Sequence, residues 1–339
     1  MTDTALPAHV PLAVATRGAH VENVHAGSLV VTDAAGQLVY AAGDAAFPVF
    51  ARSTLKPFQA LPFVAAGGLD RFGWGGREAA MLCASHSAED VHLEIVRRML
   101  EGSGHGVDDL GCGAHVPMHY AANGTSPAAD AHWTPLHNNC SGKHAGFLAC
   151  CALHGWPHDE CLEPAHPLQA AIRDALGELA AADIERAPHG IDGCSAPVFA
   201  ISLVALARAY AQLAIGAPGT RWAPAAGRLR DAMRDAPELV SGSGRFDLAL
   251  ARQGAGDWVV KSGADGVQAV ASMSRGQALA LKLADGNARI AHAVTLAALR
   301  QLGWLDGPLS PELAAFAGDD IRNWRGTVTG HLRALLPRA

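Results

Sequence analysis

The spacing of apolar residues predicts strands near both ends of the chain. Residues 28–33 and 38–42 are rich in Val, Leu and Ala and are separated by a short segment with a glycine, a pattern typical of a β-hairpin. Residues 257–273 and 276–286 show the same strand character with turn glycines, before a helix near 288–302. We therefore expect the two ends of the chain to build a sheet.

The middle of the chain carries helix signals instead. The apolar run 141–154 ends at Gly155, a residue type that commonly follows the last helical turn. Pro167 and Pro197 stand where a proline opens a helix in its first turn. Ser53 precedes another short apolar run and is expected at the N-terminus of its helix.

Strands at both ends and helices between them indicate an α+β fold. No Pro/Ser-rich linker or charge block divides the 339 residues, so we expect a single domain over 1–339. Its sheet subregion comprises roughly 10–52 and 245–339, and its helical subregion roughly 53–244.

Composition narrows the functional classes. The formal net charge is −6, which gives no basic surface for nucleic acid, and half of the residues are hydrophobic, which suits a packed core. No apolar stretch approaches the roughly 18 residues of a membrane span. Seven cysteines and the absence of a secretory start predict a cytoplasmic protein without a disulfide framework.

Lysine occurs at only four positions, and all other basic residues are arginine. This scarcity fits a compositional bias, yet it draws attention to the lysines, because a buried lysine can lose its proton and act as a base or ligand. Ser53 and Lys56 form an S-x-x-K pair whose side chains share one helical face, as a Ser-Lys nucleophile requires. The alternative is a capping serine beside a solvated lysine.

A second candidate pair combines Ser85, in the segment C-A-S-H-S, with Lys261, in the segment K-S-G. An early S-x-x-K, a middle serine motif and a late K-[ST]-G follow the order seen in serine β-lactamases and penicillin-binding proteins. The alternative for Lys261 is an ordinary solvent-facing position on a strand.

Cysteines in two further motifs could hold zinc. Cys140 and Lys143 lie in H-N-N-C-S-G-K-H, and Cys194 lies in G-I-D-G-C-S, with His144 and Asp192 close by in sequence. Sulfur and nitrogen ligands suit Zn²⁺, although the spacing is not that of a zinc finger. Two buried free cysteines are the alternative.

Together these motifs resemble the rhizobial-type, or class 3, L-asparaginases of the L-asparaginase II family. Six blocks carry the resemblance in order: T-R-G-A-H-V-E-N-V-H-A-G-S, R-S-T-L-K-P-F-Q, C-A-S-H-S, H-N-N-C-S-G-K-H-A-G, G-I-D-G-C-S-A-P and K-S-G-A-D-G-V. The resemblance implies a fold similar to that of the penicillin-recognising serine enzymes and a homodimer. It also implies hydrolysis of L-asparagine to L-aspartate and ammonia, and a zinc ion beside the substrate pocket.

The resemblance also implies individual roles. They are Ser53 as nucleophile with Lys56 as its base, Ser85 and Lys261 as a supporting couple, Cys140, Lys143 and Cys194 as zinc ligands, and Arg52, His144 and Asp192 at the substrate end. A lysine must be neutral to bind a metal. The chain departs from the expected pattern at Ala88, where glycine is expected after S-H-S.

The resulting hypothesis is a cytoplasmic amidohydrolase that cleaves the side-chain amide of L-asparagine through a Ser-Lys acyl-enzyme. One competing hypothesis is a penicillin-recognising serine hydrolase, of the peptidase or β-lactamase type, and hydrolysis of a chromogenic β-lactam would favour it. The other is a non-catalytic zinc or thiol protein in which the serines are helix caps.

Overall fold

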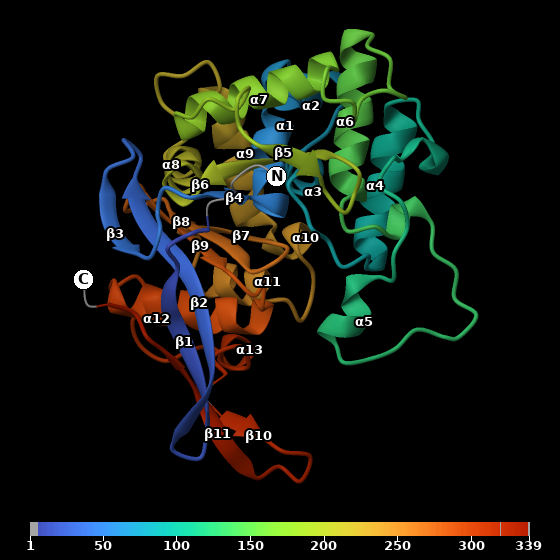
Figure 1. The fold of residues 1–339 in the computed structure, drawn as a ribbon. Helices are drawn as coiled ribbons and strands as arrows, with labels where there is room; N and C mark the ends of the chain where they lie inside the picture. Colours follow the sequence, from blue (N-terminus) through green and yellow to red (C-terminus); the bar gives the residue numbers. More distant parts are fainter. Residues whose placement is uncertain (1–5, 319, 338–339) are drawn as a thin grey trace.

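The computed structural model describes residues 6–318 and 320–337 and has an α+β architecture (Figure 1). A curled antiparallel sheet has the order β10-β11-β1-β2-β9-β8-β7, with β3 also paired to β2. Its strands are β1 (Val10–Arg17), β2 (His20–Asp33), β3 (Leu38–Ala42), β7 (Trp258–Gly263), β8 (Val267–Ser272), β9 (Gln277–Leu283), β10 (Asp320–Arg322) and β11 (Val328–Ala334). The two ends of the chain thus build one sheet, with β2 paired directly to β9.

The segment between β3 and β7 is mostly helical. It contains α1 (Lys56–Ala65), α2 (Gly68–Arg71), α3 (Gly76–Leu82), α4 (Asp90–Gly102), α5 (Met118–Ala122), α6 (Ser141–His154), α7 (Pro167–Ala180), α8 (Leu203–Ala214), α9 (Ala223–Asp235), α10 (Pro237–Val240) and α11 (Phe246–Gln253). Three short 3₁₀ turns, η1 (Arg52–Leu55), η2 (Val107–Asp109) and η3 (Pro135–His137), join these elements. Two further helices, α12 (Ala288–Gln301) and α13 (Pro311–Ala314), follow β9.

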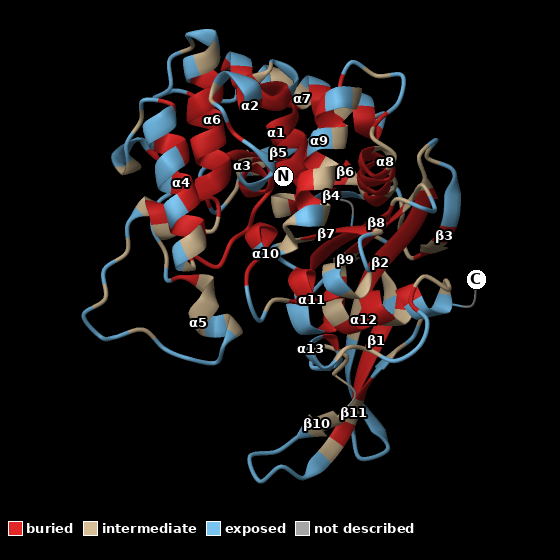
Figure 2. Cartoon of the chain, turned by 180° about the vertical axis from the view of Figure 1, so that it is seen from behind, coloured by how far each residue is buried: buried red, intermediate tan, exposed pale blue. Residues whose placement is uncertain are grey.

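The sheet is buried on both faces because helices cover both of them, and alternate residues of its central strands point to opposite sides. Val30 and Ala280 belong to the hydrophobic cluster of the helical region, where α8 packs on the sheet. Their neighbours Leu29 and Leu281 belong to a second cluster that includes α12. Figure 2 shows the consequence, with buried residues along the central strands and on the sides of helices that face the sheet.

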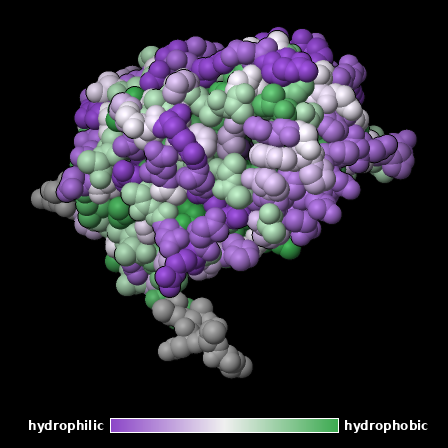
Figure 3. All heavy atoms as spheres, turned by 90° about the horizontal axis from the view of Figure 1, so that it is seen from above, coloured by the Kyte–Doolittle hydropathy of each residue, from purple (hydrophilic) through white to green (hydrophobic). Residues whose placement is uncertain are grey.

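The arm that ends the sheet is largely exposed to solvent (Figure 2). Strands β10 and β11 form an arm beyond the helices, next to the far ends of β1 and β2 (Figure 1). Seen from above, hydrophilic and hydrophobic side chains are interspersed over the surface (Figure 3). Among the described residues, no helix combines the length and apolar character needed to cross a membrane.

Several predicted elements are confirmed. The hairpin of β2 and β3 forms, and α6 ends at Gly155, which adopts the left-handed backbone conformation with φ of 70°. Pro167 opens α7 as predicted. These elements depend on signals within a few residues, which is why the sequence identifies them.

The predicted helix at Pro197 is wrong at its start. Pro197–Ser202 is strand β6, which lies between β4 (Pro48–Phe50) and β5 (His189–Ile191) in a separate three-stranded sheet. Pro197 is tolerated because it is the first residue of its strand. Helix α8 begins six residues later, and its N-terminus is capped by the Ser202 side chain, which accepts a hydrogen bond from the amide of Ala205.

Tyr210 ties α8 to the turn that precedes α1. Its hydroxyl donates a hydrogen bond of 2.7 Å to the carbonyl of Thr54, and its side chain is fully buried. Removing the hydroxyl leaves that carbonyl without this partner in a place that water does not reach, so Tyr210→Phe should lower the free energy of unfolding by about 1–3 kcal/mol.

The matched control is Tyr40→Phe, which removes a similar hydroxyl bonded to the carbonyl of the exposed residue Pro337. Water can replace that partner, so we expect a loss of about 1 kcal/mol or less. Urea unfolding measures both variants, and equal losses would contradict a special role for Tyr210.

Candidate active site

A cavity of about 520 Å³ lies between the helical region and the β7 edge of the sheet. Among the residues that line it are Ser53, Ser85, Asn139, Arg245 and Asp265. A cavity of this size is typical of small-molecule sites. Both serines predicted to take part in catalysis therefore border the same space.

Ser85 lies where two lysine side chains meet. The Nζ atom of Lys56, at the start of α1, is 2.9 Å from Ser85 Oγ, and the Nζ atom of Lys261, on β7, is 2.8 Å from the same oxygen. Lys56 Nζ also donates to the carbonyl of Ala84 at 2.6 Å. The two lysine side chains are buried, with 1% and 0% of their surface exposed. The structure thus forms a continuous Lys56–Ser85–Lys261 chain.

An acidic group lies next to this chain. Asp247, on α11, accepts hydrogen bonds from the amide and the hydroxyl of Ser262 at 2.7 and 2.8 Å, and from the Gln268 side chain at 3.2 Å. Lys261 donates at 2.8 Å to the carbonyl of Ser262. Asp247 is buried, and its position is fixed by these contacts from β7 and β8.

The surroundings of Lys261 lower its pKa to about 7. Burial is the largest cause because it disfavours the charged amine, and the positive charges of Lys56 and Arg245 act in the same direction. Asp247 opposes them and keeps the shift from being larger. Lys261 is therefore able to exchange a proton near neutral pH.

Ser53 lies in the turn η1, one turn before Lys56, and is partly exposed where it borders the cavity. Among the described residues, the hydrogen bonds of Lys56 go to Ser85 and to the carbonyls of Ala84 and Asn139, and none goes to Ser53. The structure therefore brings Lys56 into contact with the second serine motif, whereas Ser53 is one of the residues that line the cavity.

Arg52, directly before Ser53, is held by two carboxylates. Its Nε atom donates to Asp192 at 2.8 Å, and its Nη1 atom is paired with Asp265. The pairing of β4 with β6 brings Arg52 and the loop after β5 together. Arg52 also adopts a φ of 53°, an uncommon conformation for a residue with a side chain.

The predicted metal ligands form a buried cluster. Lys143 Nζ lies 3.0 Å from Cys194 Sγ, and Cys140 and His144 contact the same thiol. Hydrogen bonding from Cys140 and the charge of Lys143 lower the pKa of Cys194, although burial opposes this shift. Burial lowers the pKa of His144 to about 4, so its ring is neutral at physiological pH.

The donor set of this cluster fits zinc only with the lysine included. Among residues 6–318 and 320–337, no three His, Cys, Asp or Glu side chains are placed to hold a metal ion. Two thiols and the Lys143 amine supply three donors of the sulfur and nitrogen type that Zn²⁺ prefers, once Lys143 has lost its proton. Without the metal, Cys194 and Cys140 raise the pKa of Lys143 although burial opposes them, so zinc would have to displace that proton. His144 adds a buried Nε2 atom that has no hydrogen-bond partner among the described residues.

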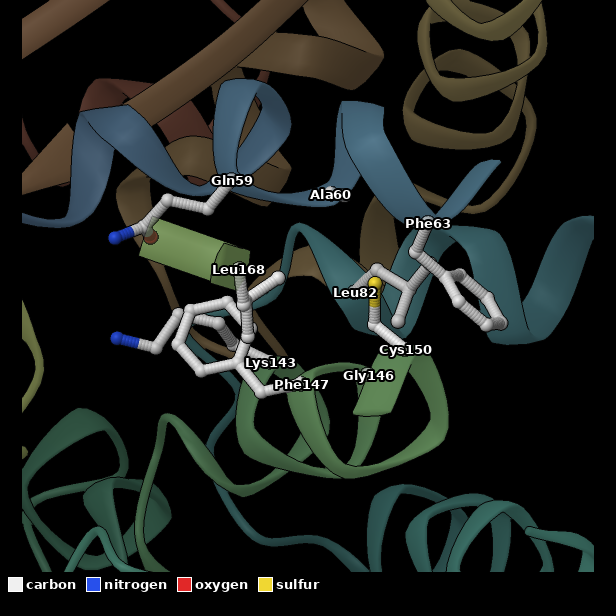
Figure 4. A pocket seen from close by; sticks show the side chains of 9 residues that line it. All are labelled: Gln59, Ala60, Phe63, Leu82, Lys143, Gly146, Phe147, Cys150 and Leu168. Atoms are coloured by element: carbon white, nitrogen blue, oxygen red, sulfur yellow. The ribbon is translucent and has the colours of Figure 1, made fainter. Parts of the chain in front are cut away.

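The stem of Lys143 also borders a void of only about 10 Å³ between α1 and α6. Figure 4 shows the Lys143 nitrogen and the Gln59 amide on one side of this void, away from Cys150 and Phe63. The void holds at most one water molecule. It is a packing gap, and the larger cavity is the candidate substrate site.

Ala88 occupies the position where glycine was expected. It adopts a φ of 58° and is buried, so the left-handed backbone that favours glycine is present here with an alanine. Helix α4 begins at Asp90, with Glu89 as its N-cap. The hydroxyl of Ser87, which precedes Ala88, donates to the carbonyl of Ser241.

Three residues near the site are not among those predicted from the sequence. Asp247 and Gln268 support the Lys261 strand, and Asn139 offers its carbonyl to Lys56 at 3.4 Å. Asn139 could have been found, because it lies in the same block as Cys140. Asp247 gave no such signal.

The chain was also compared with known proteins. The family model described as L-asparaginase II matches residues 13–334. The chain belongs to the L-asparaginase II family. Membership identifies it as a hydrolase of the L-asparaginase type and confirms the resemblance of its motifs. No curated protein matches the chain.

The lowered pKa of Lys261 predicts how stability depends on pH. Between about pH 7 and the ordinary value of 10.5, the folded protein holds the Lys261 amine neutral while the unfolded chain holds it protonated. The unfolded state then binds more protons, so the free energy of unfolding rises with pH, by up to about 1.4 kcal/mol per pH unit from this group. Lys261→Met should remove this rise in urea unfolding between pH 6.5 and 9.

Lys282→Met provides the control for this measurement. Lys282 lies on the neighbouring strand β9, is partly exposed and has a pKa that burial lowers, without the large shift of Lys261. Lys282→Met should therefore change the pH dependence of the free energy of unfolding less than Lys261→Met does. An unchanged slope in Lys261→Met would show that this amine is charged throughout the pH range.

Proposed function

We propose that the chain hydrolyses the side-chain amide of L-asparagine, giving L-aspartate and ammonia, through an acyl-enzyme formed on Ser53. Family membership supports the reaction class. The observation that carries the mechanism is the buried Lys56–Ser85–Lys261 chain beside a cavity that Ser53 also lines. Such a chain supplies the base that a serine needs to become a nucleophile.

Ser53 is the better nucleophile candidate of the two serines because its hydroxyl is available. The Ser85 hydroxyl already contacts two amines, and the residue is only 4% exposed, whereas Ser53 is partly exposed at the cavity. Ser53 also lies just before α1, where the helix dipole favours negative charge that develops on its oxygen. Catalytic hydrogen bonds often shorten only when substrate is bound, so Lys56 can take its part without contacting Ser53 beforehand.

Ser85 serves as a proton relay in this scheme. A hydroxyl between two amines can accept a proton from one and donate its own to the other. When the pair of lysines holds a single proton, that proton can move between Lys56 and Lys261 through the Ser85 hydroxyl. Lys56 acts as the base toward Ser53 while the shared proton lies on Lys261.

The chemical steps follow from these roles. Ser53 Oγ bonds to the side-chain carbonyl carbon of asparagine while its proton moves to Lys56. The carbon–nitrogen bond then breaks, and the nitrogen leaves as ammonia with the proton that Lys56 returns. A water molecule, deprotonated by the same lysine, attacks the ester, and Ser53 regains its proton as aspartate leaves.

We also propose that the end of the site that receives the substrate is shaped by Arg52, His144 and Asp192. The ion pair between Arg52 and Asp192 fixes the backbone next to Ser53, which supports a positioning role. His144 lies on α6 in contact with Cys194, so it links this end to the thiol cluster.

Zinc bound by Cys140, Lys143 and Cys194 is also a proposal. Its support is the convergence of the three donors on one buried place. Because this set does not include either serine, a zinc ion there would orient substrate or loop and would not activate the attacking water. The fold of the penicillin-recognising enzymes, the homodimer and the cytoplasmic location likewise stay proposals that rest on the resemblance or on the sequence.

Lys56→Arg tests the mechanism. Arginine stays protonated in proteins, so it cannot accept the Ser53 proton, and we expect ammonia release from L-asparagine to fall by about 10³-fold or more. Ammonia is measured with L-asparagine, L-glutamine and D-asparagine, with and without Zn²⁺, and circular dichroism checks the fold. Full activity of Lys56→Arg would contradict the mechanism. Hydrolysis of a chromogenic β-lactam in place of asparagine would favour the penicillin-recognising alternative.

Cys194→Ser tests the metal site independently of activity. We expect about one zinc per chain in the wild type after loading and dialysis, and a large loss in Cys194→Ser, because zinc binds a serine hydroxyl far more weakly than a thiolate. Cys150→Ala is the control, since this buried cysteine faces the small void of Figure 4. Equal zinc content in all three proteins, measured by mass spectrometry of the metal, would contradict the site.

A further inference from the structure

Arg245 is a cation on the cavity wall whose charge has no carboxylate partner. It lies at the N-cap of α11 and lines the same cavity as Ser53 and Ser85. Among the described residues, its guanidinium makes no salt bridge, and its side-chain hydrogen bond goes to the sulfur of Met118 at 3.4 Å. A thioether is a weak acceptor, so most of the five N–H donors of the guanidinium lack a strong partner.

The neighbouring acid does not satisfy this cation. Asp247 is two residues away, but both of its oxygens already accept hydrogen bonds from Ser262 and Gln268. Burial lowers the pKa of Arg245, which is the effect expected of a guanidinium that has lost water without gaining a paired carboxylate. A partly buried charge in this position is stabilised when an anion binds next to it.

The other arginine near the nucleophile is already occupied. Arg52 is paired with both Asp192 and Asp265, so two carboxylates neutralise it before any substrate enters. Arg245 is therefore the arginine of this cavity that is free to bind an anionic ligand.

We propose that Arg245 binds the α-carboxylate of the substrate, so that the cavity selects amides that carry a carboxylate at the end opposite to the scissile bond. A planar guanidinium binds a carboxylate through two parallel hydrogen bonds, which fixes orientation as well as charge. The Ser53 hydroxyl and Arg245 would then hold the two ends of one amino acid. The inference rests on the proposed function and names the specificity of the same site.

The test compares two substrates in Arg245→Met. L-Asparagine carries the α-carboxylate, and 3-aminopropanamide is the same skeleton without it. With L-asparagine, we expect kcat/KM of Arg245→Met to fall by about 10- to 100-fold, mainly through KM, because the variant lacks the charge-assisted hydrogen bonds to the α-carboxylate. With 3-aminopropanamide, the wild type and the variant should have the same kcat/KM.

Arg252→Met is the matched control. Arg252 lies on the same helix, with about half of its side chain exposed, and its guanidinium is paired with Glu312. It should behave as wild type with both substrates. Two results would overturn the role of Arg245 and leave the proposed function standing. One is an equal loss of kcat/KM on both substrates in Arg245→Met. The other is no loss of kcat/KM on either substrate, while the wild type hydrolyses L-asparagine.

Binding of L-aspartate, followed by calorimetry, tests the same contact without catalysis. We expect the dissociation constant to rise by about 10- to 100-fold in Arg245→Met and to stay unchanged in Arg252→Met. If the wild type does not hydrolyse L-asparagine, the proposed function fails and this binding result still decides the anion site. Arg245→Lys keeps the charge, so its dissociation constant for L-aspartate should lie between those of the wild type and Arg245→Met. If Arg245→Met does not fold, Arg245→Lys takes its place in the test. Aspartate binding as tight as in the wild type by a folded Arg245→Met would overturn the proposal.

Discussion

The site depends on two lysine amines that share one buried serine hydroxyl. Lys56 and Lys261 both lie within 2.9 Å of Ser85 Oγ, and neither side chain is exposed to more than 1%. Two ammonium groups cannot be held so close in a buried place without a large electrostatic penalty. The arrangement therefore favours a neutral amine at neutral pH, which is the form that can take a proton from a serine. Asp247 limits the effect, so that the pKa of Lys261 stays near 7 and does not fall further.

The fold brings this arrangement together from distant parts of the chain. Lys56 comes from the start of α1, Ser85 from the loop after α3, and Lys261 from the outer strand β7 of the sheet. That strand lies at the sheet edge opposite the β10–β11 arm, and its Lys261 end meets η1. The small sheet of β4, β6 and β5 adds Arg52 and the loop that bears Asp192 and Cys194. The cavity is thus the junction of the sheet edge, the first helix of the inserted region and the thiol cluster.

Much of this could be predicted, for reasons that differ between elements. Helix α6 and the β2–β3 hairpin carry their boundaries in a few adjacent residues, such as the left-handed Gly155. Strand β6 was predicted as helix, because Pro197 signals a helix start locally while its pairing with two distant strands decides the outcome. Likewise, the spacing S-x-x-K indicated a contact between Ser53 and Lys56, yet Lys56 contacts Ser85, since the direction of a side chain depends on the whole surrounding core. Asp247 and Arg245 could not be predicted, because each acquires a role only from neighbours that the fold supplies.

The central claim is that an aspartyl ester forms on Ser53 while Ser85 relays protons between the two lysines. Rapid acid quenching during turnover of L-asparagine, followed by proteolysis and mass spectrometry, identifies the serine that carries the acyl group. We predict one aspartyl group on the peptide that contains Ser53, and none on the peptide that contains Ser85. An aspartyl group on Ser85 would contradict the account. So would the absence of a modified peptide, if the enzyme is turning over and the quench is able to trap such esters.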